Sequence, residues 1–576
     1  MLSAEGADVN VNVRVNMRGS DPLALGAARL IVLYCHRAPD LRSADRSAQM
    51  MADQTLTAYD EVLYPSYTHN QTHPDRLATI ATLFGLKPTP VERCRVLELG
   101  CGNGSNLVPM AYGLPGSEFV GIDLAARPVA KGREMAAALG LRNVTLRQAS
   151  ILEVSSAFGL FDYIIAHGVY SWVPPNVSEK VLEICRANLA PSGVAFVSYN
   201  VYPGNHLRHM LREMMLFHVR GFESPAERVK QAIALTRFLA ESKLEADPYR
   251  LFLKDELEKL LTHEKGHLYH DELAEFNSPL YFHEFIAQAA QHELQYLGEA
   301  DYFEMLDDLF PSPVSQTLRQ LGGNRILREQ YLDFLKCRRF RQTLLCHTNI
   351  SLNTTPRPAE VVRFHLSSSA HPASPKPELH SKAIERFESI RGAKMETDFP
   401  LAKAAMVILG EIWPQQLLFS ELLARARARL GEQPELTDRS LEEQTQQFCA
   451  LLLQTYGAGL VELHLHAPNY AQTASERPVA SPVARWQIRQ GDFVTTLRHL
   501  SVQVEDELGR QLLTLLDGTR DRTALLRELT AFLQSRGALA APNHQAAAGA
   551  ESTRQKLAED LEKNLAKLAR LALLIA

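Results

Sequence analysis

A glycine-rich turn that links a short apolar run to a helix-like segment is the part of this sequence best suited to binding a ligand. It reads Cys94-Arg-Val-Leu-Glu-Leu-Gly-Cys-Gly-Asn-Gly-Ser-Asn106. A buried strand that enters a helix through glycines presents backbone N–H groups at its carboxyl end, where nucleotide-like ligands bind. The glycines are spaced G-x-G-x-G, and Ser105 stands where a dinucleotide-binding turn has its third glycine. The turn therefore favours a nucleotide-like ligand other than a dinucleotide.

An acidic residue follows the glycines at the distance expected for a ribose contact. The segment Glu118–Leu124 has the pattern of a second strand, and it contains Asp123 about 20 residues after the turn. A carboxylate at this place can accept hydrogen bonds from both ribose hydroxyls. The alternative interpretation is that Asp123 caps the next helix.

Further strands alternate with helices on both sides of this pair. Strands are predicted at 143–148, 161–167 and 193–200, with helices at 127–139 and 181–189. Another helix is predicted from Asp75 to Phe84, because Pro74 suits the first helical position. Strands that alternate with helices predict an α/β fold with a parallel sheet.

Five pieces of the sequence together resemble one group of methyltransferases. They are Gln71–Leu77, Leu97–Gly104, His167–Val173, Tyr281–Phe285 and Arg338–Thr343. The second piece resembles motif I of the class I S-adenosylmethionine (AdoMet) methyltransferases. Over residues 51–545 the set resembles the bacterial methyltransferases with a methyltransferase regulatory domain, a group similar to the outer-membrane-protein lysine methyltransferases. The resemblance implies a class I methyltransferase (Rossmann-like) seven-stranded sheet and AdoMet as the cofactor.

The resemblance assigns the cofactor contacts to the ends of the predicted strands. The three glycines of the turn would face the amino-acid part of AdoMet, and Asp123 the ribose. Ser150 stands near the place where these enzymes often carry the aspartate that contacts adenine, and its hydroxyl can still accept a hydrogen bond. The predicted cofactor-binding residues are Glu98, Gly100, Cys101, Gly102, Asn103, Gly104, Asp123, Leu124, Ser150, Ile151 and His167.

Methyl transfer to an amine requires a neutral acceptor, because an ammonium group has no lone pair. Lysine has a reference pKa of about 10.4, so burial or a base must remove its proton. We predict His167 as the base, beside an aromatic slot that attracts the cation. The predicted slot residues are Tyr170, Trp172, Tyr199 and Tyr202. The alternative for each ring is a place in the hydrophobic core.

Composition narrows the partners and the compartment. A formal net charge of −5 gives no electrostatic basis for nucleic acid or an anionic membrane as a partner. The seven cysteines include no C-x-x-C pair, which argues against a disulfide framework and for a reducing, cytoplasmic compartment. The apolar run Leu23–Tyr34 is too short to span a bilayer, so no stable membrane insertion is expected.

The segment His263-Glu-Lys-Gly-His267 matches H-E-x-x-H, the pattern that places two zinc ligands one helical turn apart. Gly266 weakens the helix that this pattern needs. We therefore favour hydrogen-bonded or solvated histidines and predict no metal site, with a zinc hydrolase as the remote alternative.

Seven regions are expected along the chain. They are a disordered or artefactual extension (1–50), the AdoMet-binding core (51–204), a helical regulatory or lid insertion (205–290), the completion of the sheet (291–365), a linker (366–383), a winged-helix-like domain (384–545) and an amphipathic terminal helix (546–576). The sixth and seventh strands are predicted at 294–298 and 340–346.

The C-terminal regions are predicted to contact protein rather than DNA. Residues 416–430 contain no Lys/Arg cluster of the kind that reads a DNA groove. The terminal helix carries a leucine stripe that either packs on its own domain or forms a homodimer. The sequence thus favours an AdoMet-dependent methyltransferase that modifies lysine in a protein substrate. The alternatives are a small-molecule methyltransferase and a catalytically inactive AdoMet-binding partner module.

Overall fold

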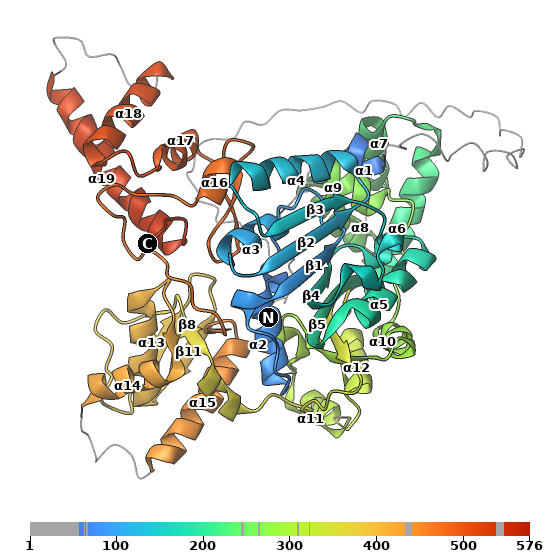
Figure 1. Ribbon diagram of the computed structural model, residues 1–576, viewed down its shortest axis with the longest axis horizontal. Coiled ribbons are helices and arrows are strands. Elements are labelled where there is room, and N and C mark those ends of the chain that lie inside the picture. Colours follow the sequence, from blue (N-terminus) through green and yellow to red (C-terminus); the bar gives the residue numbers. More distant parts are fainter. Residues whose placement is uncertain are drawn as a thin grey trace, which may run out of the picture.

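A computed structural model describes most of the chain (Figure 1). The described residues are 57–62, 64, 67–242, 247–262, 265–307, 310–321, 323–431, 440–536 and 547–576. The extension predicted over residues 1–50 lies outside them.

The centre of the structure is a mixed sheet with the strand order β3-β2-β1-β4-β5-β7-β6 (Figure 1). Its strands are β1 (Arg95–Leu99), β2 (Glu118–Asp123), β3 (Val144–Gln148), β4 (Phe161–Ala166), β5 (Leu189–Asn200), β6 (Leu294–Glu299) and β7 (Phe340–His347). The first five strands run parallel, and β7 lies antiparallel between β5 and β6. This sheet confirms the predicted seven-stranded α/β fold.

Helices cover both faces of this sheet, as the buried strands require. Val96 of β1 packs in the core beneath α2 (Pro74–Leu83), α3 (Leu107–Gly113) and α4 (Ala126–Ala138). Its neighbour Leu97 faces the opposite core, beneath α5 (Pro175–Asn188) and α10 (Phe282–Gln291). Because successive side chains of a strand alternate between faces, a strand buried on both sides needs apolar residues on both, which β1 has at Val96, Leu97 and Leu99.

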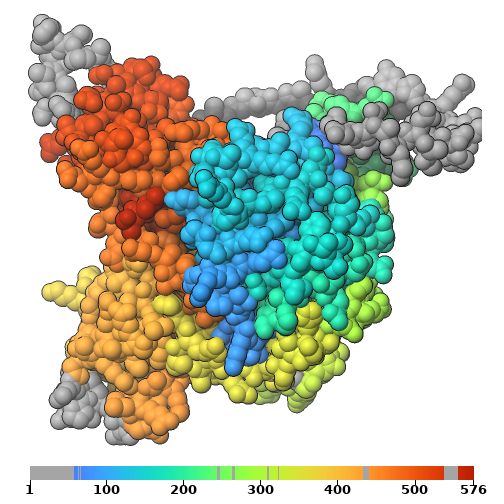
Figure 2. All heavy atoms as spheres, viewed as in Figure 1, coloured from blue at the N-terminus to red at the C-terminus, as the bar shows by residue number. Residues whose placement is uncertain are grey.

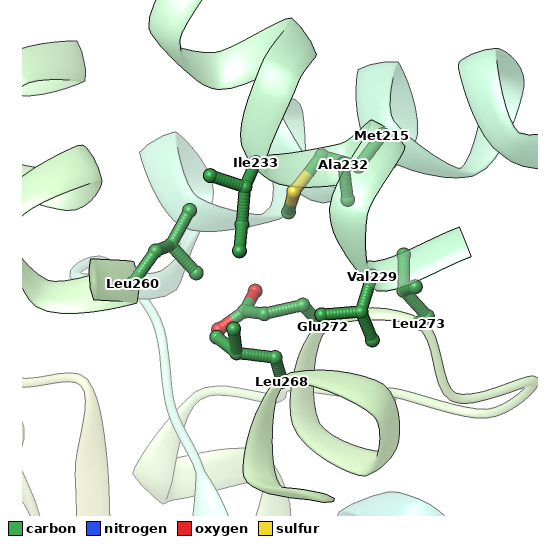
Figure 3. Close-up of a pocket in the computed structure, with 8 residues that line it drawn as sticks. All are labelled: Met215, Val229, Ala232, Ile233, Leu260, Leu268, Glu272 and Leu273. Atoms are coloured by element: carbon green, nitrogen blue, oxygen red, sulfur yellow. The ribbon is translucent and has the colours of Figure 1, made fainter. Parts of the chain in front are cut away.

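The helical insertion after β5 forms a small core of its own. It contains α6 (Asn205–His218), α7 (Pro225–Glu241), α8 (Pro248–Thr262), the short α9 (Lys265–His267) and a π-helical turn, Leu268–Glu272. A small cavity in this core is lined by aliphatic side chains and Glu272 (Figure 3), whose carboxylate pairs with Arg208. His263 and Glu264 of the H-E-x-x-H match lie outside the described residues, within which no cluster of metal ligands occurs.

The predicted linker at 366–383 is wrong at its start. It begins within β8 (His365–Ser367) and includes β9 (His371–Pro372), and β8 pairs with β12 (Leu417–Leu418) and β13 (Glu462–His464). Ser367, Ser368 and Ser369 of this segment are buried, and the Ser368 hydroxyl donates to the carbonyl of Leu460 at 2.6 Å. A buried, hydrogen-bonded serine is part of a folded unit, although its residue type also favours loops.

The C-terminal half folds as two units rather than one. The first adds β10 (Glu385–Glu388), β11 (Lys394–Thr397), α13 (Pro400–Ile412), α14 (Phe419–Leu430) and α15 (Leu441–Gly457). The second has a separate core and contains α16 (Pro482–Gln487), β14 (Phe493–Thr495), β15 (Ser501–Gln503), α17 (Glu507–Leu515), α18 (Arg522–Ser535) and α19 (Ala547–Arg570). The single domain predicted over 384–545 therefore crosses a real boundary. The leucine stripe of α19 packs into the second core.

Both C-terminal units lie against the part that contains the sheet (Figure 2). No helix within the described ranges is long and apolar enough to cross a membrane.

A buried carboxylate fastens the first C-terminal unit to the methyltransferase-like part. Asp75, at the start of α2, accepts hydrogen bonds from the backbone N–H groups of Leu465 and His466 at 2.7 and 2.9 Å. Its second oxygen lies 2.7 Å from His464 Nδ1. Burial opposes the charge of Asp75, but His464 and these hydrogen bonds lower its pKa to about 2. The carboxylate is therefore charged at neutral pH and fully paired.

We expect Asp75→Ala to lower the free energy of unfolding by about 3 kcal/mol, because it leaves a buried partner uncompensated. Glu92→Ala is the matched control, since Glu92 pairs with His466 at 2.8 Å but its side chain is 49% exposed. The control should lose less than about 1 kcal/mol. Urea unfolding of both variants compares them, and equal losses would contradict this assignment.

Candidate functional site

The glycine turn lies at the carboxyl end of β1, at the edge where β2 and β4 also end (Figure 1). Gly100, Gly102 and Gly104 have φ values of +73°, +53° and +69°, which favour glycine. A Cβ on Gly100 would lie 2.6 Å from the Val169 side chain, and one on Gly104 would lie 2.9 Å from Leu146. A Cβ on Gly102 would meet nothing within 4 Å. Gly102 therefore borders open space.

Asp123 ends β2 beside this turn. One carboxylate oxygen accepts from the N–H of Gly102 at 2.8 Å, and the other accepts from the N–H of Ala125 at 2.9 Å. Each oxygen keeps a second lone pair for another donor. Burial raises the pKa of Asp123, and the two backbone donors oppose that rise. Asp123 thus makes a contact like that of a helix cap, and its contact with a ribose stays a prediction.

Glu98 supplies a buried acceptor under the turn. It is 4% exposed, and its Oε1 accepts from Asn106 Nδ2 at 2.7 Å. Its Oε2 has no hydrogen-bond partner among the described residues. Burial raises the pKa of Glu98 to about 8. A buried oxygen without a donor fits a ligand that brings one, such as an amino group.

Asn106 joins Glu98 to distant parts of the chain. Its oxygen accepts from the N–H of His69 at 2.9 Å and lies 3.0 Å from His499 Nε2. Its nitrogen donates to Glu98 and to the Thr72 hydroxyl, the latter at 3.0 Å. All four hydrogen-bonding positions of the amide are thus occupied. Sequence reasoning missed Asn106, His69 and His499 as site residues.

His167 follows β4 and faces the same edge. Its ring centre lies 3.9 Å from that of His69 and 6.3 Å from that of Phe340. Its Nδ1 is buried and has no partner among the described residues. Burial, and then His69, lowers its pKa well below the usual value. The ring is therefore neutral at physiological pH, and the same shift makes it a weaker proton acceptor than a free imidazole.

Two of the predicted slot residues belong to the core. The Tyr170 hydroxyl donates to Gln288 at 2.6 Å, and the Tyr199 hydroxyl lies 2.9 Å from the Thr343 hydroxyl. Both rings pack on Phe285, at centre distances of 5.2 and 4.0 Å. The prediction that Tyr170 and Tyr199 line the slot is wrong, because both point into the core beneath α10.

The other two slot residues are partly exposed. Trp172 ends the 3-10 turn Tyr170–Trp172 after His167. Tyr202 lies just after β5, where its ring stacks on His206 at 4.0 Å. For these two rings the slot remains a prediction.

The remaining predicted contacts surround the turn. Asn103 Oδ1 accepts from the N–H of Ser105, and the Cys101 thiol is buried. Leu124 is 59% exposed beside Asp123. Ser150 caps the 3-10 turn Ile151–Glu153, so its hydroxyl already accepts from the N–H of Leu152 at 3.2 Å.

The second C-terminal unit reaches this edge directly. His499, at φ +57° between β14 and β15, inserts its ring beside Asn106. The Ser501 hydroxyl accepts from the N–H of Thr68, and Tyr67 packs edge-on against Phe493 at 4.8 Å. These contacts hold the segment that leads into His69.

Three family models match the chain. They are a methyltransferase domain (residues 90–260), a predicted methyltransferase regulatory domain (264–347) and a PKMT C-terminal winged helix domain (476–573). The regulatory match includes β6 and β7, rather than most of the insertion predicted over 205–290. The winged-helix match covers the second C-terminal unit.

Relatives and solved structures agree with these matches. An uncharacterized protein of Rickettsia prowazekii is 32% identical over 83% of this chain and 86% of its own length. The structure of PKMT2 from Rickettsia typhi is 28% identical, with a TM-score of 0.79 over 89% of this chain and 100% of that one. The same protein in complex with AdoHcy gives 29% identity and a TM-score of 0.78.

Four neutral histidines at this edge predict acid sensitivity. Burial is the main cause that lowers the pKa of His69 and His73 to about 4 and that of His167 and His499 well below 6.5. A base whose pKa is lower in the folded state binds more protons when unfolded, so stability is lost as the pH falls below about 6.5. Burial also opposes protonation of His464, but Asp75 and Glu462 outweigh burial and raise its pKa. His464 therefore partly offsets the loss of stability that the four neutral histidines cause at low pH.

We expect the thermal midpoint of unfolding to decrease as the pH is lowered from about 7 to about 5. The variant His499→Gln should make this pH dependence shallower. Thermal unfolding across this range measures both. A midpoint that rises on acidification would contradict the assignment.

Proposed function

The chain belongs to the class I AdoMet-dependent methyltransferases that carry a methyltransferase regulatory domain and a PKMT-type winged-helix domain, and we propose that it methylates lysine side chains of a protein. The observation that carries the proposal is the likeness to PKMT2 of Rickettsia typhi, which extends through both C-terminal units. A similarity limited to the part that contains the sheet would indicate AdoMet chemistry but would not indicate the class of acceptor.

The residues at the edge of the sheet fit AdoMet as the cofactor. The unpaired Oε2 of Glu98 can accept from the amino group of AdoMet, and Gly102 leaves room for the amino-acid part of the cofactor. Asp123 keeps lone pairs for the ribose hydroxyls. When bound, AdoMet supplies an already activated methyl group. The protein therefore has to align the acceptor and exclude water.

The acceptor amine must lose a proton before it reacts. We assign His167, whose neutral ring exposes no charge that would repel a lysine ammonium, as the group that receives this proton. Because burial lowers the pKa of His167 well below the usual value, the ring is a weak base, and the ammonium must be desolvated for the proton to move. Transfer from water into a partly buried edge also favours the neutral amine. Trp172 and Tyr202 would bind the cationic side chain of lysine or methylated lysine against the faces of their rings.

We propose the cytoplasm as the compartment and a protein as the partner. Six described cysteines, of which all but Cys337 are buried, are free thiols, as a reducing compartment allows. The net charge of −5 gives no attraction for nucleic acid.

We expect isotopically labelled AdoMet to transfer label to bacterial protein fractions, from which hydrolysis releases methyl-lysine. Asp123→Ala should weaken AdoMet binding, measured by calorimetry, by about 1–3 kcal/mol, because a charged hydrogen-bond acceptor is lost. AdoMet binding without protein labelling would instead support a small-molecule methyltransferase or an AdoMet-binding partner module.

We expect His499→Ala to weaken AdoMet binding about fivefold, although His499 lies in the winged-helix domain. It removes one hydrogen bond to Asn106, and a bond of this kind contributes about 1 kcal/mol. His499→Gln, which keeps a donor, should restore much of the affinity. His466→Ala is the matched control, because it breaks a contact between units without touching Asn106. Equal losses in His499→Ala and His466→Ala would exclude a specific positioning role.

A further inference from the structure

Helix α12 (Arg325–Lys336) exposes four large apolar residues, although its Leu332 is buried. The residues that it buries include Glu329, Gln330 and Asp333, each less than 5% exposed. Its exposed large apolar residues are Leu327, Tyr331, Phe334 and Leu335, at 40%, 44%, 47% and 45%. Residues spaced four, seven and eight apart share one helix face. A helix that covers a core normally has the reverse arrangement.

The buried face of α12 is polar because it encloses the guanidinium of Arg341. Asp333 accepts from Arg341 Nε at 2.9 Å and from Nη2 at 2.8 Å, and Glu329 pairs with the same group at 3.2 Å. Glu299 of β6 accepts from Arg341 Nη1 at 2.5 Å, and the guanidinium lies 3.8 Å from the ring centre of Phe282. The polar face is thus fully used by the fold. The apolar face has no such role.

A row of rings connects this apolar face to the edge of the sheet. Tyr331 lies 5.8 Å from Phe334, Phe334 lies 6.2 Å from Tyr281, and Tyr281 lies 5.5 Å from Tyr202, all between ring centres. Tyr202 follows β5 by two residues, next to the site. We call Tyr202, Tyr281, Phe334 and Tyr331 the aromatic row.

The spacing of the aromatic row suits an extended peptide. Side chains on one face of a strand repeat about every 6.8 Å, close to the distances between these rings. An extended segment also points its apolar side chains in the same direction as a lysine two positions away.

The charge at the site end of the row complements a basic acceptor. Glu213 and Glu284 are exposed and lie near Tyr202. Burial is the main cause that raises the pKa of Tyr202, and Tyr281 and these two carboxylates add to the rise. Glu284 also caps α10 by accepting from the N–H of Tyr281 at 2.8 Å. Two carboxylates beside aromatic rings attract a lysine or a methylated lysine.

We propose that the aromatic row binds an extended segment of the acceptor protein whose apolar side chains alternate in phase with the methylated lysine. This inference rests on the proposed function and names the sequence class that the enzyme selects. The aromatic row binds the apolar side chains of the segment, and its end at Tyr202 positions the lysine at the edge of the sheet beside His167.

The test uses two labelled peptides of equal composition with one central lysine. One peptide has valine at every second position in phase with the lysine, and the other has the valines shifted by one position. Binding to the full-length enzyme saturated with AdoHcy is measured by fluorescence anisotropy, and methylation is measured separately with labelled AdoMet. We expect the in-phase peptide to bind at least about tenfold more tightly, as several buried anchors would give.

The variant Tyr331→Ser/Phe334→Ser should abolish this preference and leave AdoMet affinity unchanged. Both residues are exposed, so the substitutions spare the core. Phe238→Ser is the matched control, because Phe238 of α7 is 55% exposed and makes no ring contact with the aromatic row among the described residues.

Each outcome separates the two proposals. In-phase binding without methylation would support the aromatic row and overturn lysine as the acceptor. Methylation of both peptides with equal affinity, or a preference that survives in the double variant, would overturn the aromatic row. Sedimentation that shows a dimer in the wild type and a monomer in the double variant would reassign this face to self-association and overturn the proposal.

Discussion

The side-chain amide of Asn106 is the contact on which the geometry of the site depends. Its four hydrogen-bonding positions receive the backbone of His69, the hydroxyl of Thr72, the carboxylate of Glu98 and the ring of His499. A buried amide is stable only when such partners are present together, because each unmade bond leaves a desolvated group. The cofactor edge is therefore completed by the winged-helix domain, and the sheet alone does not define it.

The motifs that suggested the family are explained by contacts between segments. Asp75, in the first motif, fastens α2 to the strand that holds His464. The two later motifs meet where Arg341 lies over the ring of Phe282, and Thr343 reaches both Tyr199 and Glu299. Charged groups at these junctions are buried and paired, which demands one arrangement of the units. The motifs thus record how the parts are held together as well as where the cofactor binds.

Short sequence patterns predicted the strands and the edge of the sheet that binds the ligand. They could do so because a strand buried on both faces and a glycine turn can each be recognised from a few consecutive residues. The edge position of Asp123 followed from the end of β2. The side of the sheet on which the Tyr199 ring lies did not follow from the sequence, because a ring in a buried strand fits either face of the sheet until the register with β7 is known. His499 could not be found at all from the sequence, since it lies 393 residues after Asn106. The same non-local packing places the first two residues of the predicted linker in β8.

Helix α12 shows why periodicity alone cannot assign the inner face of a helix. Its sequence has both an apolar and a polar stripe, and the usual rule would bury the leucines and aromatic rings. The fully buried Arg341 reverses the choice, because an unpaired guanidinium in the core would cost far more than an exposed apolar stripe. Asp333 and Glu329 must therefore face inward, and the apolar side chains are left on the surface by the same rotation. The charge that organises the regulatory domain thereby also creates the apolar surface beside the site.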